Sequence, residues 1–147
     1  MIQRKQSLYL LLGAALIAAT YFFSLWHVDY KNDSDTVLQT KKLRIVEHLP
    51  LLIVMVFSVI LILACLFSFK NYARQMRLGF ASLILLITFI VQCLMKISSL
   101  QNDISNPINP TYSLAMVLPF AAIVAILIAL FYIRKDKKLI DSLNHLR

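Results

Sequence analysis

The chain has 147 residues, of which 60% are hydrophobic and 15% are charged, whereas a soluble domain averages about 45–50% apolar and about 25% charged residues. A soluble core of this size cannot hide so much apolar surface, so the composition excludes an ordinary soluble globular domain. The formal net charge is +8, but the basic residues flank long apolar runs. Anionic lipid head groups are the nearer partner for such residues, so we expect membrane lipids and no nucleic acid as partners.

Four apolar segments are predicted to be membrane-spanning helices, because each has 18 to 22 residues and none contains Asp, Glu, Lys, Arg or His. At about 1.5 Å per residue such helices are roughly 27–33 Å long, which matches a hydrocarbon core of about 30 Å. The predicted spans are Leu8–Trp26, Leu49–Phe69, Leu78–Met95 and Tyr112–Ile133. The fold class predicted is therefore all-α, an integral-membrane antiparallel four-helix bundle that forms a single domain over residues 1–147.

The first segment also has the basic head and apolar run of a secretory signal peptide. A cleaved signal needs small residues in an A-x-A-like arrangement, but Ala18 and Ala19 are followed by Thr20 and three aromatic residues. We therefore expect this segment to stay in the protein as its first span.

Counting Lys and Arg on alternate sides of the membrane predicts the orientation. Ten lie on the side of the two termini and residues 70–77, and five lie on the other side. The positive-inside rule therefore predicts a bacterial inner membrane protein with both termini cytoplasmic. Residues 70–77 are expected to form a short cytoplasmic turn. The outer loop 27–48 is expected to be irregular or to form a short strand or helix. In the outer loop 96–111, Pro107 and Pro110 each bias the residue before them away from helix.

The tail 134–147 is predicted to form an amphipathic cytoplasmic helix. Leu139, Ile140, Leu143 and Leu146 fall at positions i, i+1, i+4 and i+7, which places them on one helix face. Such a helix would lie on lipid, continue the fourth span into water, dock a partner or fold back on the bundle.

No span contains an ionisable side chain, which is the usual sign of transport or proton relay. The most polar position expected inside a span is Gln92, which together with Thr88 could line a polar pocket, although an interhelical hydrogen bond is the favoured role. Cys65 and Cys93 are expected near opposite ends of their spans, too far apart for a disulfide. We predict no catalytic residue and no cofactor.

The ends of the first outer loop hold the residues best suited to bind a metal. His27, Asp29, Glu47 and His48 combine imidazole and carboxylate ligands, and the two histidines flank the loop. Their spacing matches no metal motif, so no metal site is predicted, and His27, Glu47 and His48 remain weak candidates.

Small residues recur four positions apart in the first and fourth spans, at Ala14 and Ala18 and at Ala121, Ala125 and Ala129. Faces of small side chains let two helices approach closely in a membrane. We expect these spans to pack against each other, with an intermolecular interface as the alternative. Pro119 is expected to bend the fourth span.

The two ends of the chain carry a recognisable pattern. The start "MIQRKQSLYLLL" and the end "IRKDKKLIDSLNHLR" bracket the four spans. This layout resembles a family of small membrane proteins of unknown function from Bacteroidota, whose members begin M-I-Q-R-x-Q and end in a charged tail that closes on Leu-Arg. The resemblance implies a fold and a location but no activity.

For function, the sequence favours a non-catalytic membrane component over an enzyme. We expect a small subunit or assembly factor that contacts another membrane protein or a second copy of itself through helix packing and a basic cytoplasmic face. The alternative is a small transporter or channel for a neutral or lipid-like solute. The residues expected on the cytoplasmic interaction face are Arg4, Lys135, Lys138, Leu143, Leu146 and Arg147.

Overall fold

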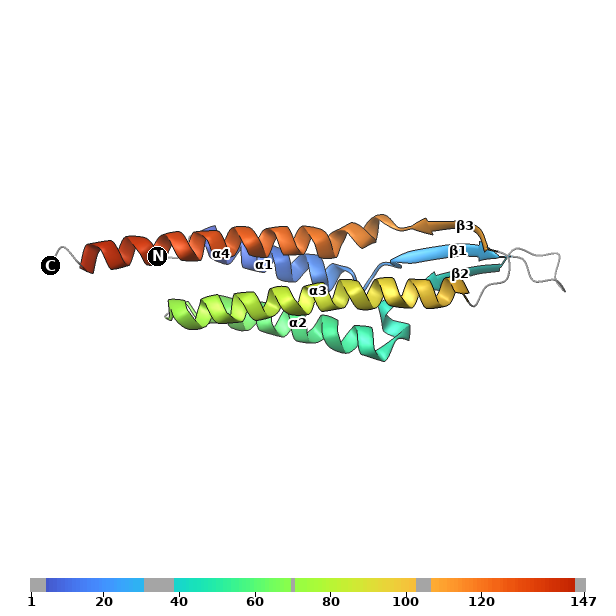
Figure 1. The fold of residues 1–147 in the computed structure, drawn as a ribbon, viewed down its shortest axis with the longest axis horizontal. Helices are drawn as coiled ribbons and strands as arrows, with labels where there is room; N and C mark the ends of the chain where they lie inside the picture. Colours follow the sequence, from blue (N-terminus) through green and yellow to red (C-terminus); the bar gives the residue numbers. More distant parts are fainter. Residues whose placement is uncertain (1–4, 31–38, 70, 103–106, 145–147) are drawn as a thin grey trace.

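The computed structural model describes residues 5–30, 39–69, 71–102 and 107–144, with side chains described throughout except at 39, 107–109 and 140–144. The described helices are α1 (Lys5–Ala19), α2 (Leu49–Phe67), α3 (Tyr72–Asn102) and α4 (Val117–Asn144). A small sheet lies at the end of the bundle opposite the first turn of α1 and the last turn of α4 (Figure 1). The chain is mainly helical, so the all-α class is confirmed in its coarse form, with the sheet as an addition.

Helix α1 is shorter than the predicted first span, because it ends at Ala19 and not at Trp26. The backbone N–H groups of Thr20, Tyr21 and Phe22 donate to carbonyls three residues earlier, and the Thr20 hydroxyl donates to the Ile17 carbonyl at 2.6 Å. The last turn therefore tightens and the helix stops. Three helical segments, Leu49–Phe67, Tyr72–Asn102 and Leu114–Leu139, are long and apolar enough to cross a membrane, whereas α1 has only 15 residues.

Helices α2 and α3 are joined by a shorter connection than the sequence predicted. Helix α2 closes at Ser68, whose N–H donates to the carbonyls of Ala64 and Cys65. Helix α3 begins at Tyr72, because the side-chain oxygen of Asn71 caps it by accepting the N–H of Arg74 at 3.2 Å. Most of the predicted turn 70–77 is therefore helical, and α3 also runs seven residues past the predicted end at Met95.

The outer loops contribute an antiparallel sheet of β1 (Trp26–Tyr30), β2 (Gln39–Leu43) and β3 (Pro107–Tyr112) in the order β2-β1-β3. Trp26 is paired with Leu43 on one side and with Tyr112 on the other. The Leu25 N–H donates to the Leu43 carbonyl, and the Leu25 carbonyl accepts the Ser113 N–H, which extends both ladders. The short-strand alternative for the first loop was the better one, and the second loop, whose prolines disfavour helix, also contributes a strand.

The last helix begins later and ends later than the predicted fourth span. A short 3₁₀ helix, η2 (Leu114–Met116), follows β3, and α4 then continues without interruption to Asn144. Pro119 is only the third residue of α4, where a missing N–H costs no helical hydrogen bond, so the mid-span bend expected from it is not required. The backbone of the tail continues α4 and does not fold back. Arg4, Leu146, Arg147 and the side chain of Leu143 lie outside the described part.

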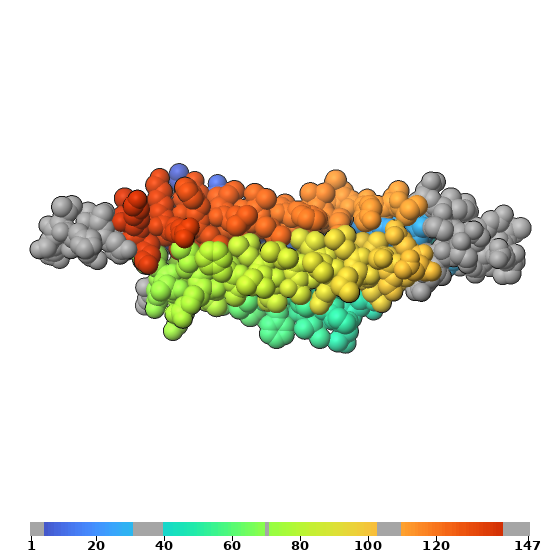
Figure 2. Space-filling view, viewed as in Figure 1, coloured from blue at the N-terminus to red at the C-terminus, as the bar shows by residue number. Residues whose placement is uncertain are grey.

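The four helices surround one apolar core. Helix α1 packs against α4 and α2, and α3 packs against α2 and α4. Figure 2 shows α3 and α4 side by side along one face, with α4 continuing past the beginning of α3. The approaches are closest at two glycines, because a Cβ atom at Gly13 would lie 3.2 Å from Ile126 Cγ1, and one at Gly79 would lie 2.4 Å from Leu130 Cδ2.

Candidate functional site

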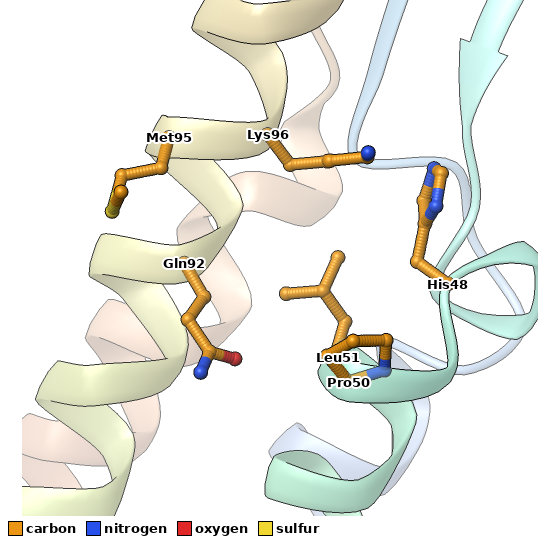
Figure 3. Close-up of a pocket in the computed structure, with 6 residues that line it drawn as sticks. All are labelled: His48, Pro50, Leu51, Gln92, Met95 and Lys96. Atoms are coloured by element: carbon orange, nitrogen blue, oxygen red, sulfur yellow. The ribbon is translucent and has the colours of Figure 1, made fainter.

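The most informative cavity is a partly open pocket of about 300 Å³ between the start of α2 and the last third of α3. His48, Pro50 and Leu51 line it from one side, and Gln92, Met95 and Lys96 line it from the other (Figure 3). The spacing of the α3 residues, i, i+3 and i+4, puts them on neighbouring positions of one helix face. The pocket therefore combines a cation, an imidazole and an amide with an apolar wall.

His48 is held at the junction between η1 (Ile45–Glu47) and α2. Its N–H donates to the Ile45 carbonyl, and its own carbonyl accepts the Leu52 N–H, both at 3.1 Å. Burial lowers the pKa of His48 below its ordinary value, the positive charge of Lys96 lowers it further, and Glu47 partly offsets this. The pocket is thus a site of positive potential in which the neutral imidazole is favoured near neutral pH.

Lys96 extends from α3 across the pocket toward His48, whereas the Met95 side chain, which lines the α3 side, is directed away from His48 (Figure 3). The oxygen Oε1 of Gln92 is buried, and it has no hydrogen-bond partner among the described residues. A buried acceptor of this kind is unfavourable unless a donor reaches it. The arrangement can therefore accept a negative group at Lys96 and an N–H or O–H donor at Gln92.

The polar pocket expected from the sequence is only partly the one in the structure. Thr88 does not line it, because this residue is exposed and its hydroxyl donates to the Ile84 carbonyl at 2.9 Å. His48 and Lys96 do line it, and sequence reasoning did not connect them with Gln92. The one available signal was the spacing of four residues between Gln92 and Lys96, which places both on the same side of a helix.

The candidate metal ligands do not come together. His27 lies on β1 opposite Lys42 and Thr111, while Glu47 lies in η1 and is exposed. Asp29 accepts a hydrogen bond from the Thr40 hydroxyl at 2.6 Å across the strand pair. Within the described ranges, no three His, Cys, Asp or Glu side chains are placed to hold a metal ion.

The small residues predicted to pack spans 1 and 4 lie in two helices that do contact each other. Ala14, Ala125 and Ala129 are buried, while Ala18 and Ala121 are half-buried. Gly13 of α1 also lies against α4, where it faces Ile126 and the Ala122 carbonyl. The sequence singled out the alanine repeats and missed this glycine.

Two further glutamines lie at the bundle end opposite the sheet, Gln6 at 1% exposure and Gln75 at 0%. Neither side-chain amide has a partner among the described residues. Both lie outside the predicted spans and are more enclosed than Gln92, which is half-buried. Cys65 and Cys93 are both buried and free, and the Cys65 thiol donates to the backbone carbonyl of Gln75 at 3.2 Å.

Comparison with known proteins identifies a family. The profile described as "Domain of unknown function (DUF4293)" matches residues 2–146. The chain belongs to this family. The expected membership in a family of unknown function is therefore confirmed, and no curated protein matches the chain.

The family has no known function, so the surface is the next guide to function. Its exposed basic side chains are concentrated at one end of the bundle. Exposed basic side chains gather at the end of the bundle away from the sheet, on the first turns of α1 and α3 and the last turns of α4. They are Lys5, Arg74, Arg77, Arg134, Lys135, Lys137 and Lys138. We call this set the basic end.

Proposed function

We propose that this chain is a multi-pass protein of the bacterial inner membrane, with four antiparallel spans, both termini in the cytoplasm and the sheet on the outer side. The support is the placement of large apolar side chains on the outside of the bundle. Leu8, Phe57, Ile84 and Phe131 are each more than half exposed, although they belong to four different helices. Water would disfavour such a surface, whereas acyl chains suit it.

The orientation follows from the basic end. Seven exposed Lys and Arg residues gather there, and the positive-inside rule assigns such an end to the cytoplasm. Anionic lipids of the inner leaflet would attract the same residues. The sheet then lies outside the membrane, with its central strand β1 following directly from α1.

We propose a non-catalytic role as a small subunit or assembly factor. The observation that carries this role is the basic end, where Arg134, Lys135 and Lys138 are exposed on the last turns of α4 and α4 itself continues past the start of α3 (Figure 2). A basic amphipathic extension of this kind suits an acidic partner surface or anionic lipid. The exposed apolar faces of the spans would supply the remaining contacts with the partner within the membrane.

Transport of a small neutral or lipid-like solute is the alternative, because a partly open pocket of about 300 Å³ lies beside Gln92. The residues that line that pocket lie toward the sheet end of the bundle, and Thr88 is not among them. A transport path would have to continue along the bundle interior, where Phe89, Leu86 and Leu83 are buried in the apolar core. The packing therefore favours the subunit role.

The insertion and orientation are tested with single-cysteine variants in whole cells. Thr40→Cys places a thiol on the sheet and Lys138→Cys places one on the basic end, while the native thiols are buried. A membrane-impermeant maleimide should label Thr40→Cys in intact cells, and Lys138→Cys only after the cells are permeabilised. The opposite pattern would refute the orientation, and release of the protein by carbonate would refute the insertion.

The subunit role is tested by affinity purification in mild detergent. Lys135→Gln combined with Lys138→Gln should weaken recovery of a stoichiometric partner by about tenfold, because two charge-assisted contacts are removed. Lys41→Gln combined with Lys42→Gln removes the same charge from the sheet and is the matched control. A protein that purifies alone, with solute flux in proteoliposomes, would favour the transport alternative.

A further inference from the structure

We propose that the pocket between α2 and α3 binds the head group of an outer-leaflet phospholipid, with the Lys96 ammonium on the phosphate and the Gln92 amide oxygen accepting an N–H or O–H of the head group. Phosphatidylethanolamine and phosphatidylglycerol carry such donors, whereas phosphatidylcholine has a quaternary ammonium without N–H. This inference rests on the membrane insertion proposed above and goes beyond it by naming a ligand.

The electrostatics of the pocket suit a phosphate. Lys96 reaches across the opening toward His48, and none of the six lining residues is acidic. Glu47, the residue before His48, is exposed and does not line the pocket. The first turn of α2 begins at the pocket wall, so the positive end of that helix dipole adds to the charge of Lys96.

The unpaired oxygen of Gln92 supplies the selectivity. Oε1 is buried with no described partner, so a ligand whose donor meets it when the half-buried side chain turns toward the pocket gains a hydrogen bond that the protein does not supply itself. A phosphate alone cannot do this when it is fully ionised, because it has only acceptors. A head group with a phosphate and a donor a few bonds away matches both Lys96 and Gln92.

The apolar wall and the position of the pocket favour a lipid over a soluble phosphate. Pro50, Leu51 and Met95 form the apolar part of the lining. Exposed Ile53 and Val91 follow one turn deeper on α2 and α3, toward the hydrocarbon core. Lys96 is the first charged residue after the apolar run of α3, so the pocket lies at the predicted boundary between acyl chains and head groups. Its volume of about 300 Å³ is at the lower end of the range for small-molecule sites, which suits a head group without its chains.

The test is native mass spectrometry of the full-length protein released from mixed-lipid micelles. Phosphatidylethanolamine and phosphatidylcholine with identical acyl chains are added in equal amounts, and the bound fraction of each is measured. The wild-type protein should retain the ethanolamine lipid about fivefold more than the choline lipid. Gln92→Leu should abolish this preference, and Lys96→Gln should lower retention of both lipids by about tenfold.

Two variants serve as matched controls, Thr88→Val one turn along α3 and Lys42→Gln on the sheet. Neither residue lines the pocket, so both variants should bind as the wild type does. Each variant is first checked for its helix content and melting temperature, and Gln92→Met, which keeps the side-chain length, replaces Gln92→Leu if the latter does not fold.

Three outcomes would overturn the inference. The first is equal retention of both lipids by the wild type, and the second is an unchanged preference in the Gln92 variant. The third is complete displacement of lipid by millimolar inorganic phosphate, which would assign the pocket to a free anion. A protein that resists carbonate extraction yet shows any of these results contradicts the lipid site alone, whereas carbonate release contradicts the proposed membrane insertion.

Discussion

Gly79→Ala tests the packing of α3 against α4. A Cβ atom at Gly79 would lie 2.4 Å from Leu130 Cδ2 and 3.3 Å from Leu130 Cγ, whereas carbon atoms in contact prefer about 3.5–4.0 Å. The Leu130 methyl must therefore retreat by about 1 Å within a core where this residue is 6% exposed. Overpacking of this kind costs about 1–3 kcal/mol, and replacing a helical glycine by alanine returns about 1 kcal/mol. We expect a net loss of about 1 kcal/mol in the free energy of unfolding.

Gly13→Ala is the matched control in α1. There the added Cβ would lie 3.2 Å from Ile126 Cγ1, so a shift of a few tenths of an ångström is enough. The gain in helix propensity should then outweigh the strain, and stability should rise by about 0.5 kcal/mol. Reversible unfolding in mixed SDS micelles, followed by circular dichroism, measures both variants under the same conditions.

A double-mutant cycle isolates the contact between Gly79 and Leu130. Leu130→Ala removes the clashing methyl groups, so Gly79→Ala should be neutral or stabilising in that background, with a coupling of about 1–2 kcal/mol. If the two changes are additive, or if Gly79→Ala stabilises the wild type as much as Gly13→Ala does, α3 and α4 do not approach as described and the reasoning fails.

Three further predictions use single residues. Pro119→Ala should lower the free energy of unfolding by about 1–2 kcal/mol, the loss of two buried methylene groups, because Pro119 lies in the first turn of α4 and removes no helical hydrogen bond; a gain in stability in SDS titration would argue against this start. Trp26, the one tryptophan of the chain, is 0% exposed, so its fluorescence should be blue-shifted and should resist acrylamide and brominated lipids; strong quenching would place it at the surface. Burial and Lys96 lower the pKa of His48 in the folded state, so its contribution to stability is complete above the ordinary value of 6.5 and decreases as the pH falls through the folded pKa. NMR titration should show that Lys96→Gln raises this pKa, and an unchanged value would mean that Lys96 does not act on His48.

The helices could be predicted because each contains a long apolar run within its own stretch of sequence. The apolar run of α2 is bounded on both sides by polar residues, and the structure places the helix at Leu49–Phe67 within it. Boundaries were less predictable where local chemistry decides them. Asn71 starts α3 earlier than predicted, and Thr20 ends α1 earlier than predicted, each through a side-chain hydrogen bond. Hydropathy alone does not detect such hydrogen bonds.

The sheet could not be predicted because its partners are far apart in the sequence. Trp26 pairs with Leu43 and with Tyr112, and neither loop shows a clear alternation of polar and apolar residues. Pro107 and Pro110 only biased the residues before them away from helix, and β3 tolerates them because it is an edge strand, where a missing N–H costs little. The pocket was missed for the same reason, because His48 and Lys96 come from segments that only the tertiary fold brings together.

The shortness of α1 explains why the sheet and the pocket lie where they do. Fifteen helical residues span about 22 Å, which is less than the hydrocarbon core of about 30 Å. Exposed Phe22 and Phe23 continue the apolar surface beyond the helix, and Leu25 then enters the sheet with its N–H bonded to Leu43 and its carbonyl to Ser113. Backbone groups that a longer helix would satisfy are thus satisfied by strands. The sheet is therefore a continuation of the bundle, and α3 extends beside it past the start of α2, which brings Lys96 to the mouth of the pocket at His48.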